Sequence, residues 1–463
     1  MSFVKRTWVA VMVLMTVTFA LSCGEAPTIK VGVGETVITP PIGTPMAGYA
    51  RPEVSKGVHD DLHARSLVIE DSRSKAVVMM TLSVINIREE LFERIRAEVS
   101  EATGIPGDNI LVSCTHTHSG PNVSAAGEEY QKLLVDNSVR SAVDAWNSRV
   151  PGRIGTGSTI ELEVGRNDRR LDWGGLHPDP EVAIIKVEDA RGNLMGVAFN
   201  YGCHPSTLDL HNFEFTEDWP YFAIEGIKNY VGEDVWVAYF QSAQGDVKVG
   251  YSAELSAVGA EMPIRNFWFA EHKGTEMSFT VLEALNEIAT VGDLTVDAAS
   301  DRFDFPLRDN YPITATEAER RDKAAKTTLA AMEAKSAELG KRVLDRYRVD
   351  VFLSGLTLGC ARWVEANPNP APVSMRMQAV RIGDSVFATF PNEVFSEIGL
   401  AVKTKSPIAK TYIIGVAGGH GGYIPTEAEY LEGGYTAVMT HFSPKCAQVC
   451  VNSALKLIGG VRQ

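Results

Sequence analysis

Histidine is scarce in this chain, with 10 among 463 residues, yet two histidines lie one residue apart in the stretch THTHSGP. These are His116 and His118, which follow the apolar run 109–115. Alternate residues of an extended chain face the same side, so both imidazoles can point into one site. Imidazole binds zinc and transfers protons near neutral pH. The pair indicates a metal or catalytic site, with two hydrogen-bonded turn histidines as the alternative.

Polar side chains of the same kind follow other apolar runs. His204 comes at the end of one run, Asp246 and Lys248 lie in the turn after a second, and Glu393 follows a third. Ligands of α/β sheets collect at the carboxyl ends of strands. If these strand ends share an edge, the polar residues converge on one site. Histidine and carboxylate together suit zinc, which takes about four ligands.

The pattern along the chain predicts an α/β fold with layered mixed β-sheets flanked by helices. No linker rich in proline, glycine or serine interrupts residues 28–463, and 365–374 is typical of a surface loop, so we expect one domain. Apolar strands are predicted at 74–86, 109–115, 194–204, 234–241 and 385–391. Helices are predicted at 88–104, 128–147, 217–232 and 392–405, with one long charged helix at 316–347.

Composition excludes one large class of function. The chain is 45% hydrophobic and 22% charged, as in folded globular proteins, and its formal net charge is -14. A nucleic-acid binder needs a clustered basic face. We therefore expect no nucleic-acid partner, and we read the acidity mainly as an aid to solubility.

Residues 1–23 are predicted to be a signal peptide. Lys5 and Arg6 precede an apolar run that ends in ALSC. This ending, followed by Gly24, resembles a bacterial lipobox in which Cys23 would carry lipid. Ordinary cleavage slightly further on is the alternative, and an uncleaved anchor ranks third because the run is short for a spanning helix. We expect an exported protein, either a periplasmic or cell-surface lipoprotein tethered to the membrane through Cys23, or a secreted one.

The six cysteines are too few for a disulfide scaffold. Cys446 and Cys450 lie one helical turn apart and could pair or bind a metal. Two small buried residues on one helix face are the commoner case, and we favour that interpretation.

Five motifs together resemble the neutral (alkaline, non-lysosomal) ceramidase family: THTHSGP, CHPS, QSAQGD, FPNE and GGYIPTEAEYLEGGY. Their order and approximate spacing match that family over nearly all of 28–460. The resemblance implies a layered α/β catalytic domain with a zinc ion in a deep pocket. It also implies hydrolysis of an amide bond, because the family cleaves ceramide to sphingosine and a fatty acid.

The resemblance assigns roles to individual residues. The implied zinc ligands are His116, His204, Glu393 and Tyr423. His118 matches the family's second histidine, which lies beside the reacting centre.

Further matches and departures concern the substrate. Tyr435 matches a tyrosine that contacts the substrate carbonyl region, and the family's arginine corresponds to Arg169 or Arg170. Lys248 occupies the position of the serine proposed as the family's nucleophile, and Val37 replaces an early aspartate. The family's C-terminal immunoglobulin-like domain is expected to be absent.

We therefore expect a zinc-dependent hydrolase that cleaves an N-acyl amide, either ceramide or a related acyl amide or ester. Its substrate would be a lipid-like or N-acyl small molecule. His118 would transfer protons, and Tyr435 with Arg169 would stabilise the oxyanion. Lys248 has three candidate roles: binding a substrate carboxylate, acting as a base, or lying on the surface. We rank carboxylate binding first.

Other polar residues are expected to be structural. His59 and His63 form an HxxxH pattern that we read as part of the scaffold. Asp218 could accept a hydrogen bond from a ligand histidine or act as a helix N-cap. His211, Glu214 and His420 have no assigned role.

Two alternatives remain at this stage. An amidohydrolase barrel also begins its site with an HxH pair, and a carbamylated Lys248 would then bridge two metals. That fold needs eight evenly spaced strand–helix units. The second alternative is an inactive, lipid-anchored binding protein, which the loss of the serine favours and the retention of four zinc ligands opposes.

Overall fold

The computed structural model describes residues 26–167, 175–335, 340–419 and 421–461. Two sheets form its centre. The larger contains β1 (Lys30–Val37), β3 (His63–Glu70), β4 (Ala76–Leu82), β5 (Ile110–Cys114), β6 (Val150–Ile160), β8 (Glu181–Asp189), β9 (Leu194–Tyr201) and β11 (Trp236–Gln241). Its order is β11-β9-β8-β6-β1-β3-β4-β5. The smaller has the order β13-β14-β15-β17 and contains β13 (Val296–Phe305), β14 (Val373–Ile382), β15 (Ser385–Thr389) and β17 (Lys410–Ile414).

Helices cover the outer face of each sheet. The helices are α1 (Glu89–Thr103), α2 (Glu128–Asn147), α3 (Trp219–Val231), α4 (Ala253–Ala257), α5 (Phe267–Leu285), α6 (Ala315–Glu333), α7 (Lys341–Ala366), α8 (Ser396–Lys405), α9 (Glu427–Glu432), α10 (Tyr435–Met439) and α11 (Cys446–Gly460), with a 3₁₀ turn at Gly107–Asn109. Three further pairings are two-stranded: β2 (Gly57–Val58) with β10 (Glu214–Phe215), β7 (Arg166–Asn167) with β12 (Val247–Lys248), and β16 (Glu393–Val394) with β18 (Tyr423–Ile424).

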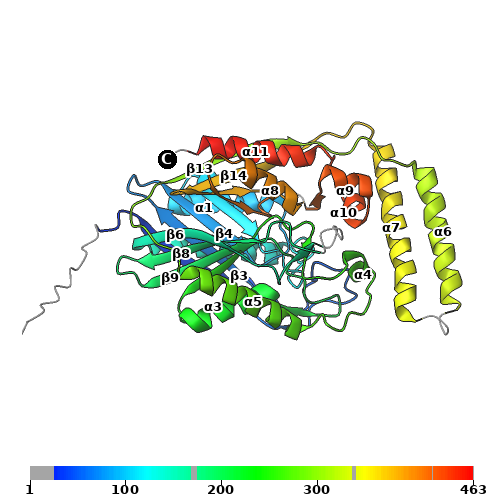
Figure 1. The fold of residues 1–463 in the computed structure, drawn as a ribbon, viewed down its shortest axis with the longest axis horizontal. Coiled ribbons are helices and arrows are strands. Elements are labelled where there is room, and N and C mark those ends of the chain that lie inside the picture. The colour runs from blue at the N-terminus through cyan, green and yellow to red at the C-terminus, as the bar shows by residue number, and fades with distance from the viewer. Residues whose placement is uncertain (1–25, 168–174, 336–339, 420, 462–463) are drawn as a thin grey trace, which may run out of the picture.

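The elements stack in the order helix, sheet, sheet, helix (Figure 1). One apolar cluster fills the space between the two sheets. Two more lie between the large sheet and α1, α2, α3 and α5, and a fourth joins the small sheet to α8 and α11. The predicted α/β class with layered mixed sheets is confirmed.

Strand β4 shows why the central runs are apolar throughout. Val78, Met80 and Leu82 face the helical cluster, and Val77 and Met79 face the second sheet. A strand that is covered on both faces cannot alternate apolar with polar residues. Burial on both sides therefore explains the continuous apolar pattern that the sequence shows here.

The prediction of one long helix at 316–347 is wrong. The chain instead forms α6 and α7, which pack against each other as a hairpin that projects from the body (Figure 1). Gly340 is the N-cap of α7 and has extended backbone angles, so a single helix cannot run through it. Likewise α8 begins at Ser396, because Glu393 belongs to the short strand β16.

The two edge strands of the large sheet, β5 and β11, approach each other. The carboxamide of Gln241 at the end of β11 donates to the carbonyl of Thr115 beyond β5, at 3.1 Å. The residues after β17 lie between them, since Gly415 N donates to Gln241 O at 2.8 Å and Cys114 N donates to Val416 O at 3.1 Å. This mixed, two-sheet arrangement of the described strands overturns the amidohydrolase alternative, which requires a barrel of parallel strands.

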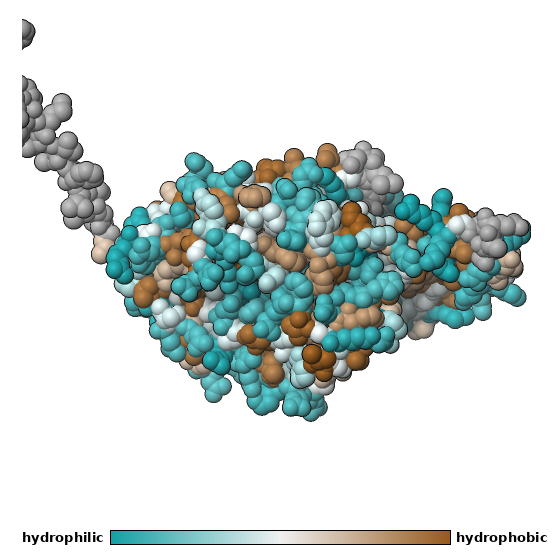
Figure 2. Space-filling view, turned by 90° about the horizontal axis from the view of Figure 1, so that it is seen from below, coloured by the Kyte–Doolittle hydropathy of each residue, from teal (hydrophilic) through white to brown (hydrophobic). Residues whose placement is uncertain are grey.

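The five described cysteines are free and buried, including Cys446 and Cys450 on α11. No helix within the described ranges combines the length and apolar character needed to cross a bilayer. On the face shown in Figure 2, hydrophilic residues predominate and apolar residues occur in separate small groups. Residues 1–23, with the predicted signal peptide and Cys23, lie outside the described part of the chain.

A buried ion-pair network joins β1, β3 and the start of α3. Arg65 contacts both Glu217, at 2.7 Å, and Glu35. Burial alone would raise the pKa of Glu217, but Arg65 and His63 lower it to about 2, below its ordinary value of 4.5. Because the folded carboxyl is the stronger acid, it adds stability above about pH 4.5 that is lost as the pH falls towards 2.

We therefore expect Glu217→Gln to destabilise the fold by about 3–5 kcal/mol at pH 7, because it leaves a buried guanidinium undercompensated. The variant should also lose part of the wild-type dependence of unfolding free energy on pH between about 4.5 and 2. Urea unfolding across this pH range measures both effects. Glu98→Gln, which breaks the exposed pair with Arg94, is the control and should cost about 0.5 kcal/mol or less. Equal effects of the two substitutions would contradict the prediction.

Candidate functional site

Three of the predicted site residues each lie just beyond the carboxyl end of a strand. His116 follows β5, His204 follows β9, and Glu393 follows β15. The short parallel pairing of β16 with β18 makes Tyr423 the direct neighbour of Glu393. The convergence predicted from the strand ends is therefore present.

Three histidines and one carboxylate form a compact cluster. Suitable nitrogens of His116, His118 and His204 all lie within 4.8 Å of one another. The ring centroids are 4.9 Å apart for His116 and His204, and 5.2 and 5.6 Å from His118 to these two rings. Glu393 Oε2 lies 3.1 Å from His204 Nε2 and 3.3 Å from His116 Nε2.

The three imidazoles differ in their hydrogen bonds. His116 Nδ1 lies 2.7 Å from the carbonyl of Ile85, and His204 Nδ1 lies 2.9 Å from the carbonyl of Val247. Each ring therefore donates through Nδ1 and presents Nε2 to the cluster, which is the tautomer of a metal-bound histidine with a backbone partner. Both ring nitrogens of His118 are enclosed, yet neither has a hydrogen-bond partner among the described residues.

The charge states also suit a cation. Burial is the main cause, and the nearby Lys248 the second, of a pKa of His204 that is lowered to about 4. Burial and the neighbouring His116 and His204 hold the pKa of His118 well below its ordinary value. Burial opposes ionisation of Glu393, but His116 and His204 keep its pKa well below the usual range. A neutral His204 and an ionised Glu393 are in the protonation states that metal ligands need, so these two donors fit a divalent ion.

Left-handed backbone at three non-glycine residues surrounds the cluster. The φ angles are 72° at His116, 62° at Asn392 and 49° at Val416. These residues are linked, because Val416 N donates to Asn392 O at 3.4 Å and Val416 O accepts from Cys114 N. Such conformations cost about 1–3 kcal/mol each and gather at functional sites.

Lys248 and Tyr435 complete the surroundings of the cluster. Lys248 is 3% exposed and interacts electrostatically with His118 and His204. The ring of Tyr435 lies 5.8 Å from that of Tyr423 and stacks on Phe352 of α7 at 5.9 Å. Lys248 therefore lies near the cluster, and Tyr435 lies beside Tyr423, which pairs with Glu393.

The turn that carries Lys248 is fixed to the segment that carries Glu393. Asp246 accepts from the backbone N–H and the hydroxyl of Ser396, at 2.7 and 2.8 Å. A side chain at Gly245 would place its Cβ 2.6 Å from the carbonyl oxygen of Glu393, so this close approach requires glycine.

The structure adds residues that the sequence did not single out. Tyr49 packs its ring 5.0 Å from that of His118, and Arg51 Nη2 donates to the His118 carbonyl at 2.9 Å. Arg265 lies behind Tyr49 and hydrogen-bonds to its hydroxyl. Only the glycine and tyrosine of the stretch MAGYAR hinted at a turn here, and nothing in its spacing pointed to His118.

Other predicted residues are structural or lie outside the described residues. His63 joins the Arg65–Glu217 network, and His59 stacks on Phe267. Asp218 is the N-cap of α3 and also accepts from Thr207, which decides between its two interpretations. Outside the described ranges lie Arg169, Arg170 and His420.

Comparison with known proteins finds relatives for part of this chain. Residues 29–171 match the family model described as neutral/alkaline non-lysosomal ceramidase, N-terminal. Neutral ceramidase A of Dictyostelium discoideum is 28% identical over 254 residues, which cover 47% of this chain and 35% of that protein. The neutral ceramidase of Pseudomonas aeruginosa is 27% identical over 232 residues, covering 44% of this chain and 34% of that protein. Over residues 29–171 the chain resembles the neutral/alkaline non-lysosomal ceramidase family.

The matched segments span about a third of the length of these curated ceramidases. The fold agrees over a longer range. The crystal structure of neutral ceramidase from Pseudomonas aeruginosa superposes with a TM-score of 0.70 at 20% identity, covering 95% of this chain and 76% of that chain. A structure described as ceramidase complexed with C2 gives the same TM-score over 94% of this chain. The ceramidase resemblance and the fold class inferred from the motifs are confirmed.

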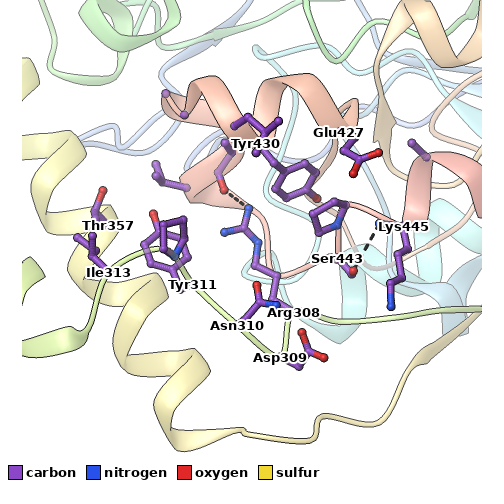
Figure 3. Close-up of a pocket in the computed structure, with 18 of the residues that line it drawn as sticks. Arg308, Asp309, Asn310, Tyr311, Ile313, Thr357, Glu427, Tyr430, Ser443 and Lys445 are labelled. Carbon is purple, nitrogen blue, oxygen red and sulfur yellow. Dashed lines mark hydrogen bonds between the residues drawn. The ribbon is translucent and has the colours of Figure 1, made fainter.

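A cavity of about 1050 Å³ lies apart from the histidine cluster, between α7 and α9–α11. In Figure 3, Arg308 lies among Tyr311, Tyr430 and Ser443 at its wall. The guanidinium donates to the carbonyls of Ala437 and Phe442, so it holds α10 and the following loop in place. None of the cluster residues lines this cavity, and we assign Arg308 an architectural role.

The donor geometry predicts binding of a divalent cation. Protein stripped with a chelator should take up about one equivalent of Zn²⁺ and gain thermal stability. His204→Ala should abolish uptake, because it removes a buried donor whose orientation is fixed by Val247. Metal analysis after gel filtration and the melting temperature report both effects. The exposed His272 provides the control, and uptake that is equal in His204→Ala and His272→Ala would exclude this site.

Proposed function

We propose that this protein is a zinc-dependent hydrolase that cleaves an N-acyl amide, either ceramide or a related acyl amide or ester. The observation that carries the proposal is the contrast between the imidazoles. Two rings are oriented through Nδ1 by backbone carbonyls, and both nitrogens of the third are enclosed without a hydrogen-bond partner in the described part of the chain. The resemblance of residues 29–171 to the ceramidase family supports the reaction class.

Four residues would hold the metal: His116, His204, Glu393 and Tyr423. Glu393 Oε2 lies within 3.3 Å of Nε2 of both His116 and His204, and strand pairing makes Tyr423 adjacent to Glu393. A zinc ion bound there would supply a Lewis acid that polarises a carbonyl and acidifies water.

His118 would transfer the protons of the reaction. A neutral imidazole accepts the proton of the attacking water, and the resulting imidazolium donates it to the leaving amine. The low pKa of the enclosed ring keeps it in the accepting form before reaction. In this proposal His118 is not a metal ligand, although its nitrogens lie in the same cluster as those of His116 and His204.

Two further groups would act on the substrate carbonyl. The Tyr435 hydroxyl would donate a hydrogen bond to the oxygen on which negative charge develops. Arg169 is the sequence candidate for a second donor and lies outside the described residues.

Lys248 would select the substrate. A buried ammonium near a metal site favours a substrate that brings an anion with it. We propose that it contacts a carboxylate of the acyl amide, at the position where the family's serine is replaced. Export as a lipoprotein through Cys23, or as a secreted protein, would place the enzyme where lipid-like substrates occur.

The second candidate is a binding protein that kept the pocket without the chemistry, and Lys248 is the feature that favours it. Loaded protein that turns over no N-acyl amide, ceramide or ester would support this candidate and exclude the hydrolase.

His118→Ala tests the proton role. We expect the variant to keep about one equivalent of zinc and to lose about 10²–10⁴-fold in kcat. Steady-state kinetics on an N-acyl amide, with metal analysis of the same sample, separates the effects. His272→Ala should match wild type in both measurements. Loss of the metal together with activity would instead make His118 a ligand.

Lys248→Ser tests substrate selection. Its effect is measured as the ratio of kcat/KM for an N-acyl amino acid to that for the same acyl amide without the carboxylate. We expect this ratio to fall about tenfold or more, because a buried partner of the carboxylate is lost. Lys410→Ser, at an exposed ion pair, is the control and should leave the ratio unchanged. An unchanged ratio in Lys248→Ser would remove the anchoring role.

A further inference from the structure

We propose that Arg51 is a positioning residue for His118, acting with Tyr49 and Arg265 as a brace behind the imidazole. The role rests on the proposed function, because it assumes that His118 transfers protons. The fixed backbone, the packed ring and the unused nitrogens of His118 are the observations that support it.

The backbone of His118 is held on both sides. Its N–H donates to Pro205 O at 2.9 Å, and its carbonyl accepts from Arg51 Nη2 at 2.9 Å. The first bond ties His118 to the segment after His204. The second is made by a side chain and can be removed by substitution without changing His118 itself.

Arg51 connects three chain segments through one guanidinium. Besides the His118 carbonyl, it donates to Ala47 O and, through Nε at 2.7 Å, to Asn212 O. All these acceptors are backbone carbonyls, so the planar fork fixes main-chain positions. Lysine has a single ammonium on a flexible stem and cannot reproduce the three contacts together.

The face of the His118 ring is fixed by the same brace. Tyr49 lies between two guanidiniums, with Arg51 5.0 Å and Arg265 5.3 Å from its ring centroid. Its hydroxyl donates to Leu208 O at 3.0 Å and accepts from Arg265. Tyr49 therefore has little freedom, and its ring limits the tilt of His118.

Gly48 allows the close packing. Its φ is +90°, and a Cβ there would lie 2.7 Å from three atoms of His118. The turn thus presses its backbone against the base of the imidazole, which no other residue type permits.

The brace makes sense of the unused nitrogens. A histidine oriented through Nδ1, as in His116 and His204, has one nitrogen left for chemistry. His118 is oriented through its backbone and ring face, so both of its nitrogens stay available to accept a proton from one group and pass it to another.

The test compares Arg51→Ala and Arg51→Lys with Arg153→Ala. Arg153 also donates to a backbone carbonyl, that of Thr290. It lies on β6 opposite Glu188, at the end of the strands that is away from the histidine cluster. We expect Arg51→Ala to retain zinc and to lose about 10²-fold in kcat with a smaller change in KM, because the imidazole is displaced from its working geometry. Arg51→Lys should recover only part of the loss, and millimolar methylguanidine should partly restore Arg51→Ala.

A second readout needs no turnover. With ¹³C-labelled histidine, the ring signal of His118 is assigned by its disappearance in His118→Ala. This signal should shift and broaden in Arg51→Ala and Arg51→Lys and stay unchanged in Arg153→Ala. If the wild-type protein turns over no substrate, the proposed function fails. The ring signal alone then decides whether Arg51 positions His118. An unchanged ring signal overturns the proposed role of Arg51, and so does wild-type kcat in both Arg51 variants. A loss of kcat that matches the loss of zinc and that methylguanidine does not restore also overturns it.

Discussion

The site depends on the buried carboxamide of Gln241. Its oxygen accepts from Cys203 N at 3.1 Å and from the Tyr239 hydroxyl at 2.8 Å. Its nitrogen donates to the carbonyls of Thr115 and Cys203, at 3.1 and 3.0 Å. One amide thus joins the residue before His116 to the residue before His204. Because an enclosed amide whose donors and acceptors are all used is costly to disturb, the separation of the two histidine-bearing segments is fixed by it.

This link also accounts for the strained backbone. The strands β5 and β11 meet over the end of β17, and the chain turns sharply where each leaves its sheet. The left-handed angles at His116, Asn392 and Val416 are the result. A β-branched residue such as Val416 rarely adopts this conformation. Burial of the surrounding sheets offsets the strain, so the donors are held in place before any ligand arrives.

The sequence predicted the convergence of the strand ends better than the residues that surround them. His116, His204 and Glu393 could be found because each follows an apolar strand, and strand ends converge in α/β folds. Tyr423 and Tyr435 came from the resemblance alone. In the structure Tyr423 pairs with Glu393, and the ring of Tyr435 lies 5.8 Å from that of Tyr423. The boundaries of α2 were predicted correctly, since its amphipathic pattern begins after a glycine.

Two features escaped prediction for physical reasons. The contacts of Arg51 and Arg265 go mainly to backbone carbonyls and to Tyr49, and a carbonyl acceptor leaves no mark on the residue type. The break between α6 and α7 was missed because the segment is polar on most sides and shows no change of pattern. The extended Gly340 sets the start of α7, and a glycine within a helical run is compatible with either outcome.

The unused nitrogens also bear on whether the pocket still has a ligand. An enclosed polar atom without a partner costs about 1–3 kcal/mol, and among the described residues neither ring nitrogen of His118 has a partner. A purely structural cluster would relax by turning one ring towards a carbonyl, as His116 Nδ1 and His204 Nδ1 have done. The brace around Tyr49 prevents that rotation of His118. Enclosed nitrogens that cannot relax in this way suit a pocket that receives a ligand beside His118, which favours a working site over a vestigial one.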